Sequence, residues 1–321
     1  MKKYDKLVSI ILVSYKTRNL LKTCLDSVIG KTKGIRYEII VVDNNSGDGS
    51  CEMVRQYFPD ITLIESKVNL GFAGGNNLGF AAAKGDCVLL LNPDSVLTEN
   101  VIETAVKTMF SDSITGILGG KILDMDGREN LAARRFPTVA RLALMRTGIS
   151  RMLHIEETII GMDYKKEMLK SPSEVDWVSG AFLLIRREVL NELRKMDDRY
   201  FLYYEEVDFC RQAKLRGWKV MFSPDVFILH VGGASGKKTG KKMSASGAQL
   251  LDIRINSEIK YFLKNKGIVS TAVLFGVEYL HFGLKYLKNR IFHNEGSSGK
   301  MDDSGTVLKS LNQNVSLLLG R

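Results

Sequence analysis

The chain has 321 residues, 45% of them hydrophobic, which is enough apolar material for a large buried core. At roughly 100–200 residues per domain, this length allows one large domain with an appendage. The formal net charge of +10 fits an anionic membrane surface or phosphorylated ligands, whereas nucleic acid is disfavoured because the sequence has no zinc-finger spacing, RNP-type aromatic pattern or basic recognition helix.

The cysteines and the N-terminal segment predict a cytoplasmic protein. Cys24, Cys51, Cys87 and Cys210 are scattered without C-x-x-C spacing, which indicates a reduced compartment and argues against zinc. The first apolar run, residues 7–13, is a strand pattern and not the h-region of a signal peptide.

The first elements in chain order are a strand, a helix and a second strand. Residues 7–13 predict a buried strand that runs into Ser14 and Tyr15, residues 19–29 an amphipathic helix, and residues 37–42 a strand that stops at Asp43. This order opens a doubly wound α/β sheet, in which ligands bind beyond the carboxyl ends of the strands. We therefore expect Asp43 to face a bound nucleotide.

A glycine-rich segment follows at residues 69–80, ahead of the alanines at 81–83. It predicts a tight turn before a helix whose first N–H groups face an anion or a ribose. Such a turn more often only closes a loop, and the spacing is neither that of a dinucleotide fingerprint nor that of a P-loop.

Asn92-Pro93-Asp94 ends the apolar run at 88–91. Side chains two apart on an extended chain point the same way, and Pro93 stops the strand ladder. The tripeptide therefore delivers two oxygen-bearing side chains to one sheet edge, where Asp94 suits Mg²⁺ or Mn²⁺ beside a diphosphate. On its own, the same tripeptide is more often a simple turn.

Residues 124–175 carry few signals of their own. Next to it, Trp177 offers an aromatic face for a sugar, and Gly180 a floor without a side chain. A tryptophan on a strand is otherwise simply part of the core.

Three acidic residues, Glu205, Glu206 and Asp208, open a helix predicted to run to about residue 216 and to close at Gly217. Carboxylates in a first helical turn are favoured by the helix dipole whatever the function. The same dipole keeps a carboxylate ionised, as a general base must be.

His230 ends the apolar run at 226–229 and precedes two glycines. A lone histidine in a strand is otherwise a core or edge residue. The basic residues at 237–242 read equally well as a loop that closes on phosphate and as a solvated surface loop.

The C-terminal third begins with a predicted helix from residue 245. The next apolar run, 268–277, falls short of the ~20 residues of a spanning helix. Aromatic and basic residues alternate after it, which predicts an amphipathic helix on anionic lipid or, nearly as well, a subunit contact; they are Phe275, Tyr279, Phe282, Lys285, Tyr286, Lys288 and Arg290. Residues 294–306 predict a flexible linker, and 307–321 a weak helix or a disordered tail.

Seven segments in order resemble the inverting glycosyltransferases of family 2, and among them the rhamnosyltransferase-like branch. They are VSIILVSY (8–15), VVDNNSGDGS (41–50), NLGFAGGNN (69–77), LLLNPDSVL (89–97), DWVSGAFLLIRREVL (176–190), FLYYEEVDFCRQAKLRGW (201–218) and ILHVGGAS (228–235). The resemblance implies a GT-A fold, Rossmann-like, with a mostly parallel central sheet flanked by helices, followed here by a C-terminal helical extension.

Carried over residue by residue, the resemblance implies a nucleotide pocket and a metal site. Ser14 and Tyr15 would line the pocket, Asp43 would accept the pyrimidine N3–H, and Asn45 and Asn76 would hold the ribose or base. Gly71 belongs to the same set. Asn92 and Asp94 take the outer positions of the family's D-x-D motif; Asn replaces its first Asp, which leaves Asp94 and His230 as metal ligands.

The resemblance also implies the catalytic base. Glu206 stands where the family commonly has the Asp of its E-D pair, so we assign the base to Glu206, with Asp208 as the second choice and Glu205 as the third. Trp177 and Gly180 would contact the acceptor.

These observations predict a catalytic domain at 1–235, a basic loop and helical extension at 236–293, and a linker and tail at 294–321. The resemblance implies metal-dependent, inverting transfer of a sugar onto a hydroxyl of a bacterial surface glycan, either lipid-linked or not, and the resemblance to the branch alone favours dTDP-L-rhamnose over a UDP-hexose as the donor. The alternatives are a non-catalytic nucleotide-binding scaffold and a nucleotidyltransferase. A homo-oligomer and a peripheral site at the inner face of the membrane are compatible with this interpretation.

Overall fold

The computed structural model describes residues 4–130, 132–147, 162–164, 166–231, 245–291 and 297–318. The chain divides into two compact units. The sheet unit comprises Met1–Phe136, Asp163–Phe201 and Glu205–Gly232, and the helical unit comprises Pro137–Met162, Leu202–Tyr204 and Gly233–Arg321. The division differs from a single boundary near residue 235, because two segments before it, Pro137–Met162 and Leu202–Tyr204, also belong to the helical unit.

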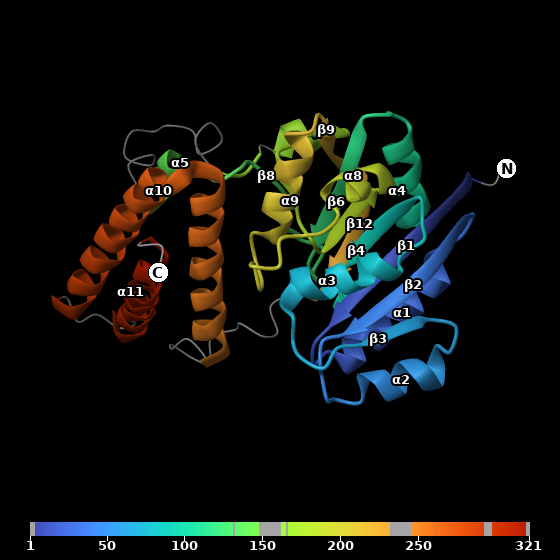
Figure 1. Cartoon of the computed structure of the whole chain (residues 1–321), viewed down its shortest axis with the longest axis horizontal. Helices are drawn as coiled ribbons and strands as arrows, with labels where there is room; N and C mark the ends of the chain where they lie inside the picture. The colour runs from blue at the N-terminus through green and yellow to red at the C-terminus, as the bar shows by residue number, and fades with distance from the viewer. Residues whose placement is uncertain are drawn as a thin grey trace. The chain divides into compact units, whose positions relative to one another are not determined.

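The sheet unit is built on one mixed sheet in the described part of the chain, with the order β3-β2-β1-β4-β11-β6-β12-β5 (Figure 1). β7 pairs with β6, β9 pairs with β12, and β8 and β10 form a separate pair. In chain order the strands are β1 (Tyr4–Ser14), β2 (Ile35–Asp43), β3 (Thr62–Glu65), β4 (Cys87–Leu91), β5 (Ser95–Val96), β6 (Thr115–Leu123), β7 (Glu129–Asn130), β8 (Ala133–Arg134), β9 (Ser173–Glu174), β10 (Trp177–Val178), β11 (Phe182–Arg186) and β12 (Lys219–His230).

The strand register places the predicted polar loops at one edge. β1 runs parallel to β2, with Ser14 opposite Asp43, and parallel to β4, with Ile11 opposite Leu90. β4 and β11 are buried along their whole length, as expected for strands covered on both faces. The strands predicted at 7–13, 37–42 and 88–91 are confirmed, and their carboxyl ends meet at the same edge.

Helices flank this sheet (Figure 1). They are α1 (Arg18–Lys31), α2 (Ser50–Tyr57), α3 (Gly71–Ala82), α4 (Val101–Phe110), α8 (Arg187–Leu193) and α9 (Glu205–Lys214), with a 3₁₀ turn η1 (Lys166–Leu169). α9 confirms the predicted helix after Glu205, and Gly217 follows it with a φ of +88°, a left-handed value that glycine adopts without strain.

The glycine-rich segment differs from its prediction, because it is the helix α3 itself and not a turn before a helix. The reason is close packing. A Cβ on Gly71 would lie 2.0 Å from the carbonyl oxygen of Phe201, and a Cβ on Gly75 or Gly79 would press into Val13 or Ile11 of β1. A glycine every fourth residue thus lets this helix lie directly against the sheet, which outweighs the helix-breaking tendency of glycine.

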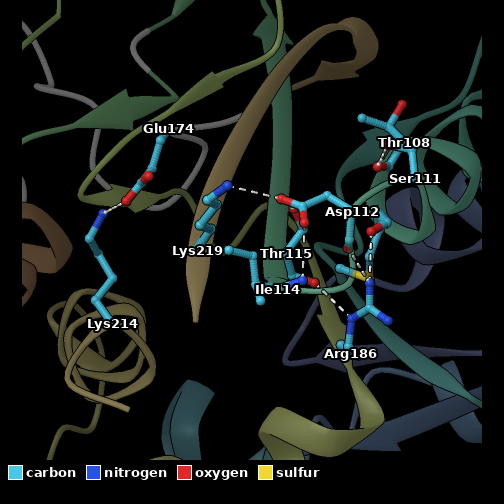
Figure 2. Close-up of polar contacts among 10 residues, drawn as sticks. Thr108, Ser111, Asp112, Ile114, Thr115, Glu174, Arg186, Lys214 and Lys219 are labelled. Carbon is cyan, nitrogen blue, oxygen red and sulfur yellow. Dashed lines mark hydrogen bonds and ion pairs between the residues drawn. The ribbon is translucent and has the colours of Figure 1, made fainter. Parts of the chain in front are cut away.

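The amino ends of β4 and β6 are fastened by Arg186, which is buried (Figure 2). Its guanidinium donates hydrogen bonds to the carbonyl oxygens of Thr115 (2.8 Å), Met109 (2.8 Å) and Asp112 (2.9 Å). Arg186 lies opposite Cys87, at the start of β4. A buried cation is tolerated here because carbonyl oxygens replace its water.

Asp112 belongs to the same cluster. Its carboxylate accepts the Ile114 N–H (3.2 Å) and an Nζ–H of Lys219 (3.1 Å) (Figure 2). These two donors hold the pKa of Asp112 below its usual range, the Ile114 N–H first. The cluster therefore remains charged and ties α4 to the start of β12.

The helical unit consists of α5 (Val139–Thr147), α10 (Ala245–Ile291) and α11 (Ser297–Leu318). α10 bends at Gly267, whose φ of 79° and ψ of 171° are not helical, so it forms two arms (Figure 1). The apolar core of this unit comprises Ile255, Ile259, Phe275, Phe282, Val307 and Leu311.

Two expectations for the C-terminal third are corrected. Residues 297–306, predicted as part of a flexible linker, lie in α11, and residues 307–318 continue it, in agreement with the helix that was one of two predictions for the tail, because Val307 and Leu311, four apart, pack into the core formed with α10. Phe275 and Phe282, predicted to face lipid, are 6% and 9% exposed and belong to the same core. The basic loop predicted at 237–242 lies outside the described residues.

The same helix corrects the length argument about membranes. Among the described residues, Gln249–Ile291 of α10 is long and apolar enough to cross a membrane by length and composition alone. Core helices of soluble proteins share this length and composition.

Candidate active site

His230, Asp94 and Asn92 form a contact cluster at the carboxyl edge of the sheet. The Nε2 of His230 lies 3.0 Å from Oδ1 of Asp94 and 3.1 Å from Nδ2 of Asn92. The side chains of His230 and Asp94 are 18% and 20% exposed, so they are sheltered and remain open to a ligand. Asn92 and His230 lie 138 positions apart in the chain and are brought together by the fold.

Backbone pairing fixes this cluster. After β4, the N–H of Asn92 bonds the carbonyl of Ala181 (3.1 Å), and the N–H of Ser95 bonds the carbonyl of Asn92 (3.1 Å). β5 then pairs with the end of β12, with Ser95 opposite His230. The N–H of Val231 closes the pairing on the carbonyl of Asp94 (2.9 Å). Both candidate ligands thus stand on hydrogen-bonded backbone.

The cluster provides some of the ligands that a divalent cation needs. A carboxylate oxygen and an imidazole nitrogen facing each other are donors that Mn²⁺ accepts. Across the described ranges there is no group of three or more His, Cys, Asp or Glu side chains that could hold a metal. The protein therefore offers two donors, and a diphosphate is the kind of ligand that supplies the remaining oxygens.

Asp43 is buried at the end of β2, next to the end of β1, and is 4% exposed. Its Oδ2 accepts the N–H of Ser46 (2.9 Å), whereas its Oδ1 is buried with no hydrogen-bond partner in the described part of the chain. A buried acceptor without a partner is costly, and an incoming N–H would satisfy it. Ser14 is also fully buried, and its hydroxyl bonds that of Thr17 (2.9 Å).

Asn44 is a residue that the sequence analysis missed. It is 2% exposed; its amide donates to the carbonyl of Gly71 (2.8 Å), and its Oδ1 accepts the N–H of Leu70 (3.4 Å). It thereby fastens the loop after β2 to the start of α3. Its place in the D-N-N-S sequence beside Asp43 is the signal that was available.

The other residues predicted to bind the nucleotide differ in exposure. Tyr15 is 43% exposed, and Asn45 is exposed with a φ of 64°, so both present side chains to solvent near Asp43. Asn76 is 1% exposed, and its amide donates to the carbonyl of Phe72 inside α3 (2.9 Å). In this arrangement Asn76 makes a helix contact, and its predicted role toward ribose remains a prediction.

Glu206 has the properties of a proton acceptor at neutral pH. Burial raises its pKa to about 7, partly opposed by backbone N–H groups and by Arg134. Its Oε2 is buried and has no hydrogen-bond partner among the residues the structure describes. Glu205 and Asp208 are 3% and 2% exposed.

Gly180 and Ala181 lie between Glu206 and the cluster of Asn92, Asp94 and His230. A Cβ built on Gly180 would lie 3.9 Å from the Cβ of Glu206 and 3.1 Å from the ring of Phe72, while the next residue, Ala181, holds Asn92 through its carbonyl. Consecutive residues therefore touch the candidate base on one side and the N-P-D turn on the other.

Trp177 is 8% exposed, and its indole N–H donates to the carbonyl of Arg135 (3.0 Å). The Arg134 guanidinium lies 5.9 Å from its ring. The indole N–H and the ring face of Trp177 thus both have partners within the protein. Its contact with the acceptor remains a prediction.

Comparison with known proteins gives a family match and similar proteins. Residues 9–194 match the family model described as Glycosyl transferase family 2. In Mycobacterium tuberculosis, an N-acetylglucosaminyl-diphospho-decaprenol L-rhamnosyltransferase is 30% identical over 207 residues, covering 60% of this chain and 66% of the relative, just under two thirds. In Escherichia coli K12, the rhamnosyltransferase WbbL is 27% identical over 234 residues, covering 70% and 83%.

Two solved structures show the same fold. A mannosyltransferase from Pyrobaculum calidifontis, in complex with GDP-Man and Mn²⁺, has a TM-score of 0.54 and 15% identity, covering 97% of this chain and 88% of its own. GalNAc-T7, with UDP, GalNAc and Mn²⁺, has a TM-score of 0.55 and 14% identity, covering 83% and 52%. The neighbours are GT-A glycosyltransferases, so the predicted fold class is confirmed.

Proposed function

This chain belongs to glycosyl transferase family 2 and has the GT-A fold, and on that premise we propose that it moves a sugar from a nucleotide-sugar donor to an acceptor hydroxyl, with inversion. The observation that carries the proposal is Glu206: burial raises its pKa to about 7, and its Cβ lies close to Gly180, which precedes Ala181, whose carbonyl accepts the Asn92 N–H. A base with a pKa near the working pH combines the correct protonation state with proton-accepting strength.

Glu206 accepts the proton of the acceptor hydroxyl as its oxygen attacks the anomeric carbon. The new carbon–oxygen bond forms on the face opposite the leaving nucleoside diphosphate, whose bond to the anomeric carbon breaks, so the configuration inverts. Asp208 is the second choice for this role, and Glu205 the third.

The donor's nucleotide binds at Asp43. The unpartnered Oδ1 of Asp43 is an acceptor suited to a pyrimidine N3–H, which thymine and uracil both carry. Ser14, Tyr15 and Asn45, at the ends of β1 and β2, and Gly71, at the start of α3, complete this binding region.

Asp94 and His230 would hold Mg²⁺ or Mn²⁺ against the diphosphate. When bound, such an ion supplies positive charge that stabilises the leaving group. The contact between Oδ1 of Asp94 and Nε2 of His230, 3.0 Å, supports this assignment.

L-Rhamnose from dTDP-L-rhamnose is the donor sugar that we favour, and a lipid-linked glycan the acceptor. The support is the similarity to relatives named as rhamnosyltransferases, one of which carries a decaprenol-linked acceptor in its name. A UDP-hexose is the second candidate, because a relative from Haloferax volcanii named as the hexosyltransferase Agl10 is 29% identical over 213 residues.

A screen of nucleotide sugars with Mn²⁺, Mg²⁺ or EDTA tests the proposal. We expect release of dTDP from dTDP-L-rhamnose, dependent on the metal and faster when a glycan acceptor is present. Release of pyrophosphate would instead indicate a nucleotidyltransferase. Binding of a nucleotide sugar without turnover would favour a non-catalytic nucleotide-binding scaffold, and failure to bind any nucleotide sugar would contradict the proposal.

A further inference from the structure

The second arm of α10, after Gly267, carries a continuous apolar face on its outer side. Large aliphatic side chains spaced by three, four or seven residues are 50% to 75% exposed: Val269, Val273, Leu280, Leu284, Leu287 and Ile291. This spacing puts them on one side of the helix. The opposite side, with Leu274, Phe275 and Phe282, is buried in the core of the helical unit.

Charge along this arm is of one sign where it is exposed. Glu278 is the only acidic residue between 268 and 291 in the sequence; it is 3% exposed and its Oε1 is paired with Nε of Arg146 at 2.9 Å. Lys288 and Arg290 are exposed near the C-terminal end of the arm, and Lys285 is half-buried with its Nζ 5.7 Å from the ring of Phe282. The outer face therefore combines apolar side chains with positive charge.

A groove of about 380 Å³ runs along the edge of this face, where the arm adjoins Arg146 of α5. Its lining includes three aliphatic side chains, Val277, Leu280 and Leu284, and three cations, Arg146, Lys285 and Lys288. Such a lining matches a molecule with an apolar part and an anionic head.

We propose that the outer face of α10 from Val269 to Ile291 docks on an anionic lipid surface, with its aliphatic side chains among the acyl chains and Lys285, Lys288 and Arg290 at the phosphates. Interfacial helices bind through buried apolar area together with attraction to anionic lipids. This inference goes beyond the proposed reaction and depends on neither donor nor metal.

Charge complementarity decides against pairing of two copies through this face. In a parallel pair the basic ends would meet each other, and in an antiparallel pair they would meet Val269 and Val273, which offer no acidic group. An anionic bilayer supplies the missing negative charge.

The packing of the inner side decides against a helix that crosses the bilayer. α10 contacts α5 and α11 along this arm's inner side, and the pair of Arg146 with Glu278 lies there. Taking these partners and their charges into hydrocarbon would be costly, whereas an interfacial position leaves them in place.

Co-sedimentation of the full chain with phosphatidylglycerol-containing vesicles and with pure phosphatidylcholine vesicles tests the proposal. We expect binding to the anionic vesicles only, falling as salt is raised because screening shortens the reach of exposed charges. Leu280→Ser/Leu284→Ser and Lys285→Glu/Lys288→Glu should each lower the partition coefficient by at least about tenfold.

Matched controls come from the sheet unit. Leu215 is 64% exposed, and Lys31 and Lys33 are exposed. Leu215→Ser and Lys31→Glu/Lys33→Glu should bind vesicles like the wild type, and circular dichroism with thermal unfolding checks that all four variants are folded.

Two results would overturn the inference. One is wild-type protein that does not bind anionic vesicles at low salt. The other is wild-type protein that is a dimer by light scattering and that Leu280→Ser/Leu284→Ser makes monomeric, with vesicle binding unchanged. Neither result bears on nucleotide-sugar turnover, so the proposed reaction is tested separately.

Discussion

At the two ends of the sheet in the sheet unit, Arg186 and the carboxylates of Asp43 and Glu206 differ in whether their buried polar atoms have hydrogen-bond partners. At the amino ends of β4 and β6, the guanidinium of Arg186 donates to three backbone carbonyl oxygens, and its carbon Cζ lies 4.4 Å from the ring of Phe110. At the carboxyl ends, Oδ1 of Asp43 and Oε2 of Glu206 are buried without a hydrogen-bond partner among the described residues.

This difference distinguishes a charged group that stabilises the fold, Arg186, from charged groups that are available to a ligand, Asp43 and Glu206. Satisfied groups such as Arg186 stabilise the fold, because the protein replaces the hydrogen bonds lost to water. Unsatisfied buried acceptors lower stability and are retained where a ligand or a proton fills them. Substitutions at the carboxyl end should therefore reduce activity with little loss of stability, and substitutions at the amino end should do the reverse.

Glu206→Gln should show the largest effect. We expect kcat to fall by about 10²–10⁴, the range for loss of a general base, while KM for the donor stays near that of the wild type. The measurement is steady-state transfer with varied donor. Asp208→Asn is the matched comparison and should be milder; the reverse order would move the base to Asp208.

Glu206→Gln should also change how the free energy of unfolding depends on pH. The pKa of Glu206 is raised by burial to about 7, above its unfolded value, so the folded state binds this proton more tightly. The resulting stability is present below the unfolded pKa and is lost as pH rises through about 7. Glu206→Gln should therefore be at least as stable as the wild type at pH 8 by thermal unfolding.

Asp94→Asn should follow, with turnover lower by about 10²–10³, because an amide keeps the shape and loses the charge that binds a divalent ion. Its melting temperature should stay close to that of the wild type. Titration of Mn²⁺ in the turnover assay is the measurement, and His230→Ala should weaken metal dependence less severely. Full activity of Asp94→Asn at low Mn²⁺ would remove Asp94 from the metal site.

Arg186→Met tests the other end of the sheet. Removing the guanidinium leaves buried carbonyl oxygens without their donors, so we expect a loss of about 3 kcal/mol in the free energy of unfolding. Denaturant titration measures it, and turnover per folded molecule should remain near that of the wild type. An unchanged free energy of unfolding would show that the bonds in Figure 2 do not fasten this end.

Lys214→Ala should have the smallest effect. Its Nζ lies 2.5 Å from Oε1 of Glu174, and the side chains of Lys214 and Glu174 are 24% and 47% exposed, so this ion pair is partly open to water and should contribute about 1 kcal/mol or less. The same denaturant titration serves as the measurement. A loss as large as that of Arg186→Met would mean that exposure does not distinguish these two cations.

The fold and the edge that carries the site were predictable because apolar runs end abruptly in polar residues. The run at 88–91 stops at Asn92, and the run at 37–42 stops at Asp43, so parallel strands had to bring these residues to one edge. The contact of His230 with Asp94 depends on β5, a strand of two residues, which leaves no periodic signal in the sequence.

Other features depended on tertiary contacts that no local pattern records. α3 is helical despite its glycines because Phe201, Val13 and Ile11 approach where side chains would otherwise stand. In α10 the pattern indicated two faces, but only the partner α11 decides that Phe282 is covered and that Leu284 is not.

The pH dependence of kcat for sugar transfer tests directly whether the buried carboxyl of Glu206 is the general base. With saturating donor, acceptor and metal, the account predicts that kcat of the wild type rises with pH through an apparent pKa of about 7, as Glu206 loses its proton, and that Glu206→Gln loses this rise. A wild-type profile that is flat from pH 5 to 9, or a Glu206→Gln variant that keeps the same rise, would contradict it.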